Sequence, residues 1–471
     1  MFAIGCKYRE MKTAKRNARG LTCEIDPLVE HYRCLENVED LVLTGKLSPE
    51  PGYFRFGQDV VCYGQVTVGS PATKVTHVLP DLSGQVTLDG TLGLPFNAVQ
   101  VVDNLRYERY TMSGNGGGSP FLHEAIRKTY YCLRPLLGVS IRKHLQRLFF
   151  RNWEHLPFPA WPVDRTVEHI LERLLLLSMQ SRQLEKVPFI WFWPHGARSC
   201  VIVTHDVETK AGAEFIPYMM DLDEGSAVRA SFQVIPERQY PVSKALLNGI
   251  RDRGFDLNVH DLRHDDNLFS DREQFVAQAR SINAYVRDWG SRGFRAGRMY
   301  RNVDWYGALD ISYDMSVPNV AHLEPQRGGC CTVFPYFIGD ILELPLTTTD
   351  DYSLFHILGD FSIELWKKQS ALVMEKHGMA SFLVHPDYII EKRARDIYGA
   401  LLKYLAALRN EQNVWIASPG EVDRWWRERS QMRLVPHDKG WRVEGPGQEK
   451  ARIAHARMVE GQIVYTWDEN P

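Results

Sequence analysis

The chain has 471 residues, of which 44% are hydrophobic and 24% charged, a composition typical of a folded protein with more than one domain. Its formal net charge of −2 excludes the global positive field expected of a nucleic-acid-binding protein. No run of about 18 uninterrupted apolar residues occurs, so the sequence predicts no transmembrane helix.

Two features of the sequence bear on the compartment in which the protein works. Basic residues, among them Lys7, Arg9 and Lys12, stand near the start of the chain, where a signal peptide needs its apolar run. We therefore expect residues 1–25 to be a disordered leader and the protein to be cytoplasmic. The eight cysteines show no C-x-x-C pair and no regular spacing, which indicates reduced, mostly buried thiols.

Residues 26–112 predict a small β-rich domain. Residues 65–69 and 85–88 alternate polar and apolar side chains, as half-buried strands do, and Asp89-Gly90 is a hairpin-turn dipeptide. A packing or scaffolding role is favoured over sugar binding, because no aromatic platform stands out in this stretch.

A linker and a helical connector are expected over residues 113–195. The glycine-rich stretch 113–120 has a linker composition, and no Gly-Lys-Ser/Thr follows it as in a phosphate-binding loop. The segment from about 121 to 185 looks helical, with a basic cluster at 134–151 that we expect to be a solvated face. Asp164 is a plausible N-cap for a helix with an apolar stripe. The stripe comprises Val167, Ile170, Leu171, Leu174, Leu175 and Met179.

Strand-like and helix-like segments alternate over residues 196–430, which we assign to a catalytic barrel. Apolar runs typical of buried parallel strands occur at 200–203, 230–235, 255–259, 341–346, 380–384 and 414–417. Helix-like segments lie between several of them, for example at 271–289 and 394–410. Because such repetition gives a parallel sheet covered on both faces, we predict an α/β fold with a distorted (β/α) barrel. Residues 431–471 return to β-like alternation and predict a small C-terminal β segment.

Polar residues that can act as acids, bases or metal ligands directly follow several of these apolar runs. In parallel barrels the reactive groups lie where strands end. Asp206 and Glu208 follow the first run and share one side if the chain stays extended. His260 and His264 follow the third run, at the spacing with which one helical turn aims two imidazoles at one ion. Arg295 and His385 stand near the ends of two further strands.

In this order the motifs resemble those of the polysaccharide deacetylase superfamily, carbohydrate esterase family 4, over about half of the chain. Thr204-His205-Asp206 is similar to the family's T-F-D-D motif, and His260 with His264 is similar to its H-[ST]-x-x-H motif. Arg295 resembles the arginine of the R-x-P-x-G motif, although the proline is missing. Residues 382–385 resemble the final histidine motif. The resemblance implies a deacetylase-like barrel.

One departure from the family concerns the metal site. The family's second aspartate, a metal ligand, is Val207 here, and an acid returns one position later as Glu208. The D-V-[DE]-T arrangement resembles a branch that deformylates a lipid-linked aminoarabinose, so by analogy Glu208 would bind the metal with His260 and His264. Another branch, resembling an allantoinase, is metal-free, so metal dependence is the favoured of two alternatives.

The resemblance also implies a role for each remaining residue. A divalent ion, with Zn²⁺ expected, would keep open positions for water and the acyl oxygen. Asp206 would take a proton from the water, Arg295 would orient Asp206, and His385 would protonate the departing nitrogen. Asp387 is a candidate for setting the tautomer of His385. The alternative for Asp206 and Arg295 is a buried structural ion pair.

Three functions remain open from the sequence. The first is a hydrolase that removes an N-acetyl or other N-acyl group from an amino sugar or carbohydrate intermediate. The second is a deformylase or other C–N hydrolase acting on a lipid-linked sugar, as the Glu208 pattern suggests. The third is a catalytically inactive carbohydrate-binding protein. We expect a carbohydrate substrate and no nucleic-acid partner. Four aromatic residues could stack on sugars or pack in the core: Trp305, Tyr306, Trp425 and Trp426.

Overall fold

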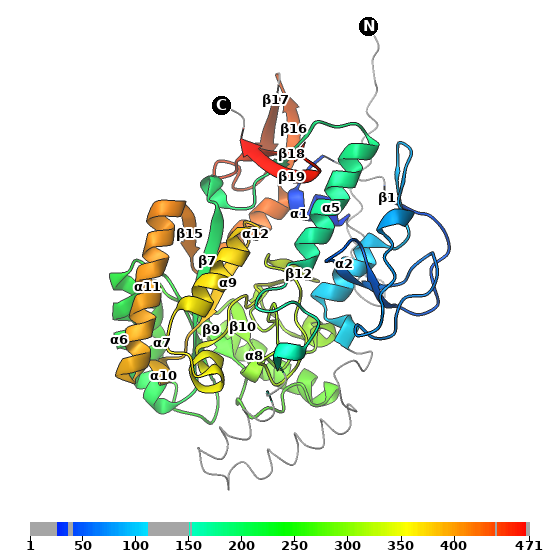
Figure 1. Cartoon of the computed structure of the whole chain (residues 1–471). Helices are drawn as coiled ribbons and strands as arrows, with labels where there is room; N and C mark the ends of the chain where they lie inside the picture. The colour runs from blue at the N-terminus through cyan, green and yellow to red at the C-terminus, as the bar shows by residue number, and fades with distance from the viewer. Residues whose placement is uncertain (1–25, 36–40, 112–149, 151–152, 439, 468–471) are drawn as a thin grey trace.

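The computed structural model describes residues 26–35, 41–111, 150, 153–438 and 440–467 (Figure 1). The predicted leader, the predicted glycine-rich linker and nearly all of the basic cluster at 134–151 lie outside these residues. The five cysteines within the described part are buried, as expected: Cys34, Cys62, Cys200, Cys330 and Cys331. In the same part of the chain, no helix is both long enough and apolar enough to cross a membrane.

A nine-stranded, largely parallel sheet forms the centre of the second half of the chain. Its hydrogen-bonded order is β12-β13-β11-β10-β9-β8-β7-β14, with β15 also paired to β7. Only β12 and β13 pair antiparallel. The strands are β7 (Ser199–Val207), β8 (Ser231–Val234), β9 (Asp256–His260), β10 (Gly293–Arg295), β11 (Tyr313–Asp314), β12 (Tyr336–Ile338), β13 (Ile341–Glu343), β14 (Met379–Leu383) and β15 (Val414–Ala417). All six predicted strands are present.

β7 is the central strand, and all nine of its residues are buried. Its first half pairs with β14 and β15, whereas its second half pairs with β8. This change of partner along one strand lets the sheet curl. The predicted distorted (β/α) barrel is confirmed by this parallel, curled sheet and its covering helices.

Threonine side chains bridge the two ends of the curled sheet, beyond the strand ladder. The segment after β13 reaches β14, where Thr347 Oγ1 donates to the Met379 carbonyl and accepts from the Ser381 amide, at 2.9 and 2.8 Å. Thr348 Oγ1 donates to the Ser381 carbonyl at 2.7 Å. Because side chains take the place of a strand ladder here, a seam lies between residues 347–349 and β14.

Helices connect the strands and cover the sheet (Figure 1). Asp271 caps α8 by accepting from the Gln274 amide, and Ser418 caps α12 in a capping box with Glu421, so local sequence sets both starts. The predicted helices at 271–289 and 394–410 are confirmed within two residues. The helices of this half are α6 (Lys210–Gly225), α7 (Lys244–Asp252), α8 (Arg272–Trp289), α9 (Glu364–Met374), α10 (Pro386–Ile389), α11 (Lys392–Gln412) and α12 (Pro419–Gln431).

The N-terminal part contains short strands and two helices, beside the parallel sheet in Figure 1. The predicted hairpin is confirmed, because β4 and β5 pair antiparallel around Asp89-Gly90. The predicted strand at 65–69 is wrong: only Val66 forms a bridge, to Phe96. The elements are α1 (Pro27–Tyr32), β1 (Leu41–Leu43), β2 (Gly52–Arg55), β3 (Val61–Gly64), β4 (Thr87–Leu88), β5 (Leu92–Leu94) and α2 (Ala98–Arg106).

Helix α5 (Thr166–Ser181) joins the parts of the protein, since it contacts α1, α2, β4, β5 and β19. Its predicted apolar stripe is buried. The predicted N-cap is wrong by one position, because Arg165 is the cap residue. Both carboxylate oxygens of Asp164 instead accept hydrogen bonds from backbone amides, those of Ala160 and Thr166, at 2.6 and 2.8 Å.

The C-terminal segment forms two hairpins, at the top of Figure 1. They are β16 (Arg433–His437) with β17 (Gly440–Glu444), and β18 (Ile453–Val459) with β19 (Gln462–Trp467). β18 also pairs antiparallel with β6 (Lys186–Ile190), a strand that precedes the barrel. The tail therefore completes a sheet begun more than 250 residues earlier.

A buried ion pair fastens the N-terminal part to the barrel. Glu108 and Arg301 are 6% and 4% exposed, and Arg301 Nε lies 2.5 Å from Glu108 Oε2. Glu108 also accepts from the Gly329 amide. Removal of one partner leaves the other charge buried without its counter-ion.

We expect Glu108→Gln to lower the free energy of unfolding by about 3–5 kcal/mol, because the Arg301 charge then stays buried and unpaired. Urea unfolding followed by circular dichroism measures the change. As a control, Glu444→Gln breaks an exposed pair with Arg442 and should cost less than about 1 kcal/mol. Equal effects from the two variants would contradict a special role for the buried pair.

Candidate active site

The end of β7 supplies two carboxylates on one side of the chain. Asp206 is its penultimate residue and Glu208 follows its last residue, so the extended backbone turns both toward the same side. Val207 between them is fully buried in the hydrophobic core. Its carbonyl accepts a hydrogen bond from the Tyr240 hydroxyl at 2.7 Å. The valine at the family's ligand position is therefore a core residue here.

The two histidines approach each other by a route that differs from the predicted one. His260 ends β9, and His264 lies in the irregular segment after it, so the predicted helical turn between them is wrong. Asp261 and His264 have positive φ angles of 55° and 53°, which fold the segment back. The centroids of the two imidazole rings lie 4.9 Å apart.

Gly297 allows this close approach. A Cβ atom at this position would lie 2.6 Å from Asp261 Oδ2 and 2.9 Å from His264 Cδ2, both too near for ordinary packing. Its amide instead donates to Asp261 Oδ2 at 3.2 Å. The glycine after the arginine strand thus keeps the second histidine in the site.

Glu208, His260 and His264 form a cluster suited to a metal ion. One ligand atom from each lies within 4.8 Å of the others. His260 Nδ1 lies 3.0 Å from the Arg295 carbonyl, so this nitrogen carries the proton and leaves the Nε2 lone pair free. His260 Nε2 is buried and has no hydrogen-bond partner among the described residues. Two imidazoles and one carboxylate are a donor set that zinc prefers, so these residues fit a divalent ion.

Asp206 lies beside this cluster and is held by two neighbours. Its Oδ1 accepts from Arg295 Nη1 and from Gln233 Nε2, both at 3.2 Å, and its Oδ2 lies 3.7 Å from His260 Nε2. Arg295 is itself fully buried and fixed by bonds to Thr204 Oγ1 and the Met315 carbonyl. The second carboxylate oxygen therefore remains available to substrate or water.

Charges in the site keep both carboxylates ionised. Burial raises the pKa of Asp206, but the Arg295 guanidinium outweighs it, so the pKa lies below the ordinary value. Burial likewise raises the pKa of Glu208, and the nearby His264 lowers it well below its usual range. Burial lowers the pKa of His260, which favours the neutral, metal-binding imidazole. Burial lowers the pKa of His264, but the Glu208 carboxylate outweighs it and raises the pKa above the ordinary value, so a metal ion binding here must displace the His264 proton.

His385 follows β14 and faces the same cluster. Its Nε2 lies 3.9 Å from Glu208 Oε1. Asp351 contacts its Nδ1 at 2.6 Å and accepts from its backbone amide at 2.8 Å. Burial lowers the pKa of His385, but Asp351 overrides it and holds the pKa well above the ordinary value. The imidazolium is therefore a proton donor at neutral pH.

The predicted role of Asp387 is wrong. Its carboxylate accepts from the Glu208 amide and from the Thr209 hydroxyl, at 3.1 and 2.5 Å, and so it fixes the backbone at Glu208. Asp351, from the segment beyond the seam, contacts His385 instead and takes the tautomer-setting role that was expected of Asp387. No motif in the sequence marks Asp351, since 34 residues separate it from His385.

A further buried network lies behind the site. His205 is fully buried, with Nδ1 2.8 Å from the Val384 carbonyl and Nε2 3.0 Å from Asp223 Oδ2. The Tyr398 hydroxyl donates to the same Asp223 carboxylate. His205 therefore ties the strand of Asp206 to the residue before His385.

Most of the aromatic residues considered for sugar stacking belong to the core. Tyr306, Trp425 and Trp426 are 0%, 3% and 6% exposed, so they cannot present a face to a sugar without rearrangement. Trp305 is half-buried and packs against Phe269 and Phe275.

Comparison with known proteins gives matches among solved structures. A probable polysaccharide deacetylase from Pseudomonas aeruginosa PAO1 is 14% identical, with a TM-score of 0.41, and the match covers 50% of this chain and 93% of that one. Puue allantoinase is 15% identical, with a TM-score of 0.40 and coverage of 50% and 92%. A mutant of BA3943, a CE4 family pseudoenzyme, is 16% identical, with a TM-score of 0.31 and coverage of 49% and 68%. No protein-family model and no curated protein matches the chain.

Proposed function

We propose that this protein is a metal-dependent hydrolase that removes an N-acetyl or other N-acyl group from an amino sugar or a carbohydrate intermediate. The proposal rests on one observation above all. A buried carboxylate held by an arginine, Asp206, lies beside the Glu208–His260–His264 cluster, and the His385 imidazolium approaches the same cluster at Glu208.

Asp206 has the properties of the general base. Amide hydrolysis requires a water molecule to lose a proton as it attacks the acyl carbon. Arg295 and Gln233 both bind Oδ1, which leaves Oδ2 on the side of His260 to accept that proton. The lowered pKa keeps Asp206 ionised and ready.

His385 has the properties of the general acid. An amine is a poor leaving group, so its nitrogen must be protonated as the C–N bond breaks. The Asp351 contact fixes Nδ1, so the opposite nitrogen, Nε2, carries the proton that points toward Glu208 and the site. Donation from Nε2 gives a neutral amine and a carboxylic acid product.

Glu208, His260 and His264 would hold the ion. When bound, a divalent ion supplies Lewis-acid polarisation of the acyl carbonyl and a lowered pKa for water. The hydrogen bond that the Glu208 backbone amide donates to Asp387 and the one that His260 donates to the Arg295 carbonyl would orient two of the three ligands.

Deformylation is the second candidate, and the position of Glu208 favours it. The D-V-E order moves the acid one residue along the chain, while Val207 enters the core. Because this acid reaches the histidine cluster, the pattern remains compatible with the branch that it resembles. A formyl group also needs less room at the acyl carbon than an acetyl group.

We expect purified protein loaded with Zn²⁺ to release carboxylic acid from at least one member of a panel of N-acetyl and N-formyl amino sugars. Chromatography of the acid distinguishes acetate from formate, which separates the two candidates. Zinc binding without acid release from any member of the panel would favour the inactive carbohydrate-binding alternative.

A further inference from the structure

Asp351 reaches His385 at the end of a segment that has no regular secondary structure. Its carboxylate is buried and contacts His385 Nδ1 at 2.6 Å, while the second oxygen accepts from the His385 backbone amide at 2.8 Å. Residues 347–350, which lead to it, form neither helix nor strand, so no strand ladder fixes the position of Asp351. Side chains from other elements must therefore bond to this segment and hold it in place.

Helix α9 holds Thr349, which lies two residues before Asp351. Gln369 Oε1 accepts from the Thr349 amide at 3.0 Å, and Gln369 Nε2 donates to Thr349 Oγ1 at 3.1 Å. The Trp366 indole donates to the Thr349 carbonyl at 2.6 Å. Gln369 and Trp366 are 2% and 1% exposed, so water does not compete for these bonds. The amide, the carbonyl and the hydroxyl oxygen of Thr349 therefore all bond to one helix.

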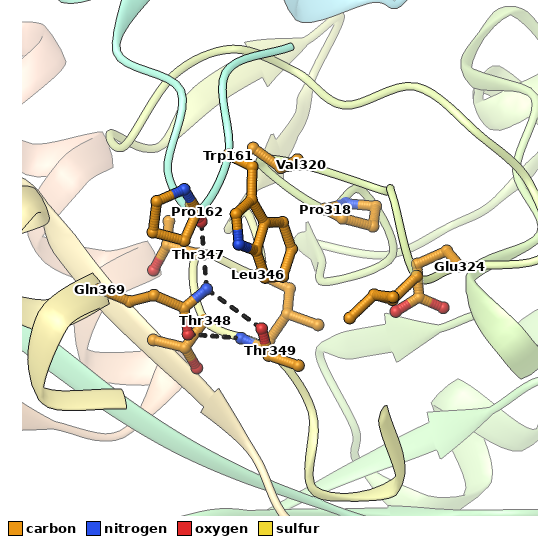
Figure 2. A pocket seen from close by; sticks show the side chains of 11 residues that line it. Trp161, Pro162, Pro318, Val320, Glu324, Leu346, Thr347, Thr348, Thr349 and Gln369 are labelled. Atoms are coloured by element: carbon orange, nitrogen blue, oxygen red, sulfur yellow. Dashed lines mark hydrogen bonds between the residues drawn. The ribbon is translucent and has the colours of Figure 1, made fainter. Parts of the chain in front are cut away.

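The same glutamine also reaches the chain that precedes the barrel. Gln369 Nε2 donates to the Pro162 carbonyl at 3.1 Å, as a dashed line in Figure 2 shows. This part of the chain is itself fixed to the barrel, because the buried Asn319 side chain bonds to the amide and the carbonyl of Asp164, both at 2.8 Å. Gln369 is therefore anchored at a fixed point outside the segment that it holds.

We propose that Gln369 is a positioning residue for the general acid, His385. Its amide group fixes Thr349, and the short chain from Thr349 to Asp351 then holds the carboxylate against the imidazole. The inference rests on the proposed function, because it takes His385 as the proton donor to the departing nitrogen. It also gives the chain before the barrel a part in catalysis, since the Pro162 carbonyl anchors the glutamine.

A purely structural role for Gln369 has different consequences. Its side chain satisfies the amide of Thr349 and the carbonyl of Pro162, both of which would otherwise lack these partners, so its loss lowers stability in either case. A positioning role adds a loss that is confined to the step that His385 performs. A displacement of about 1 Å at a catalytic group can lower the rate about 100-fold, so this added loss is measurable.

Two substrates separate the acid step from the rest of catalysis. An N-acyl amino sugar needs a proton on its nitrogen, whereas 4-nitrophenyl acetate releases an aryl oxide that leaves without one. We expect Gln369→Met in the zinc-loaded protein to lower kcat for the amide about 10–100-fold, and hydrolysis of the ester less than about threefold. The KM for the amide and the zinc content should stay within about twofold of the parent values.

Thr349→Val is the milder second variant, because valine keeps the shape of threonine and only the bond from Gln369 to the hydroxyl oxygen is lost. It should lower kcat for the amide about three- to tenfold, and it takes the same measurements if Gln369→Met does not fold. In the Asp351→Asn background, which already weakens the contact with His385, Gln369→Met should lower kcat by less than about twofold more.

A proton resonance reports on the same contact without turnover. The short hydrogen bond between His385 Nδ1 and Asp351 should give a far-downfield imidazole signal in the NMR spectrum, and Asp351→Asn assigns the signal by its loss. Gln369→Met should shift or broaden it. Gln100→Met is the matched control, because Gln100 makes the same kinds of bond to Gln65 on α2, at 3.1 and 2.8 Å. It should change neither the signal nor the two rates.

Three results would overturn the positioning role: equal losses on the amide and the ester, an unchanged His385 signal in Gln369→Met, or an undiminished loss in the Asp351→Asn background. Failure of the proposed function looks different. In that case the His385 signal still depends on Gln369, while the parent protein releases no carboxylic acid from any acylated sugar.

Discussion

Asp206→Asn is expected to lower kcat/KM for N-acyl amino sugars by about 10²–10⁴-fold while the zinc content stays near that of the parent protein. The amide has the shape of the carboxylate and can keep the hydrogen bond from Arg295 to Oδ1. It cannot accept the proton of the attacking water, so catalysis is lost and the metal ligands are not. Acid release and elemental analysis of the same sample measure both quantities.

Asp221→Asn is the matched control for this variant. Asp221 lies on α6 and is 65% exposed, and its pair with Arg253 lies at the surface. Its substitution should change neither activity nor zinc content. Activity of Asp206→Asn within tenfold of the parent protein would contradict the base assignment, and would leave Asp206 and Arg295 as a structural ion pair.

His264→Ala is expected to reduce bound zinc from about one ion per chain to a small fraction of that after dialysis. The remaining donors, Glu208 and His260, are too few to hold the ion against water. Hydrolysis should fall with the zinc content, and added zinc should restore it only in part. Inductively coupled plasma mass spectrometry measures the metal directly.

His437→Ala controls for the loss of any histidine. His437 is 54% exposed on β16 and lies beside Asp438, on the C-terminal hairpin. Its removal should leave zinc and activity unchanged. Unchanged zinc in His264→Ala would refute the ligand assignment, and it would favour the metal-free alternative that the loss of the family's second aspartate leaves open.

Local sequence was sufficient to predict the helices and strands that depend on residues close together in the chain. The apolar run before Asp206 predicted a buried strand, and all residues of β7 are buried. The helix predicted over 271–289 begins at Arg272, with Asp271 as its N-cap, because an N-cap acts within three residues. The strand at 65–69 failed for the opposite reason: alternation favours a strand, but only Val66 finds a partner, in Phe96.

The candidate site was predictable as a set of residues, and its geometry was not. Asp206, His260, Arg295 and His385 were each found because parallel strands bring their ends to one edge of the sheet. The spacing of His260 and His264 suggested a helical turn, yet positive φ angles and the room left by Gly297 bring the rings together. Backbone angles of this kind depend on neighbours from other strands.

The sequence by itself determined the α/β fold class and the residues that reach the strand ends, because strand burial and motif spacing are local properties. Only the tertiary structure decided which acid binds His385. Asp351 is brought there by the seam, while Asp387, two residues away in sequence, turns to Glu208. Such contacts arise from packing between distant segments, which no local pattern records.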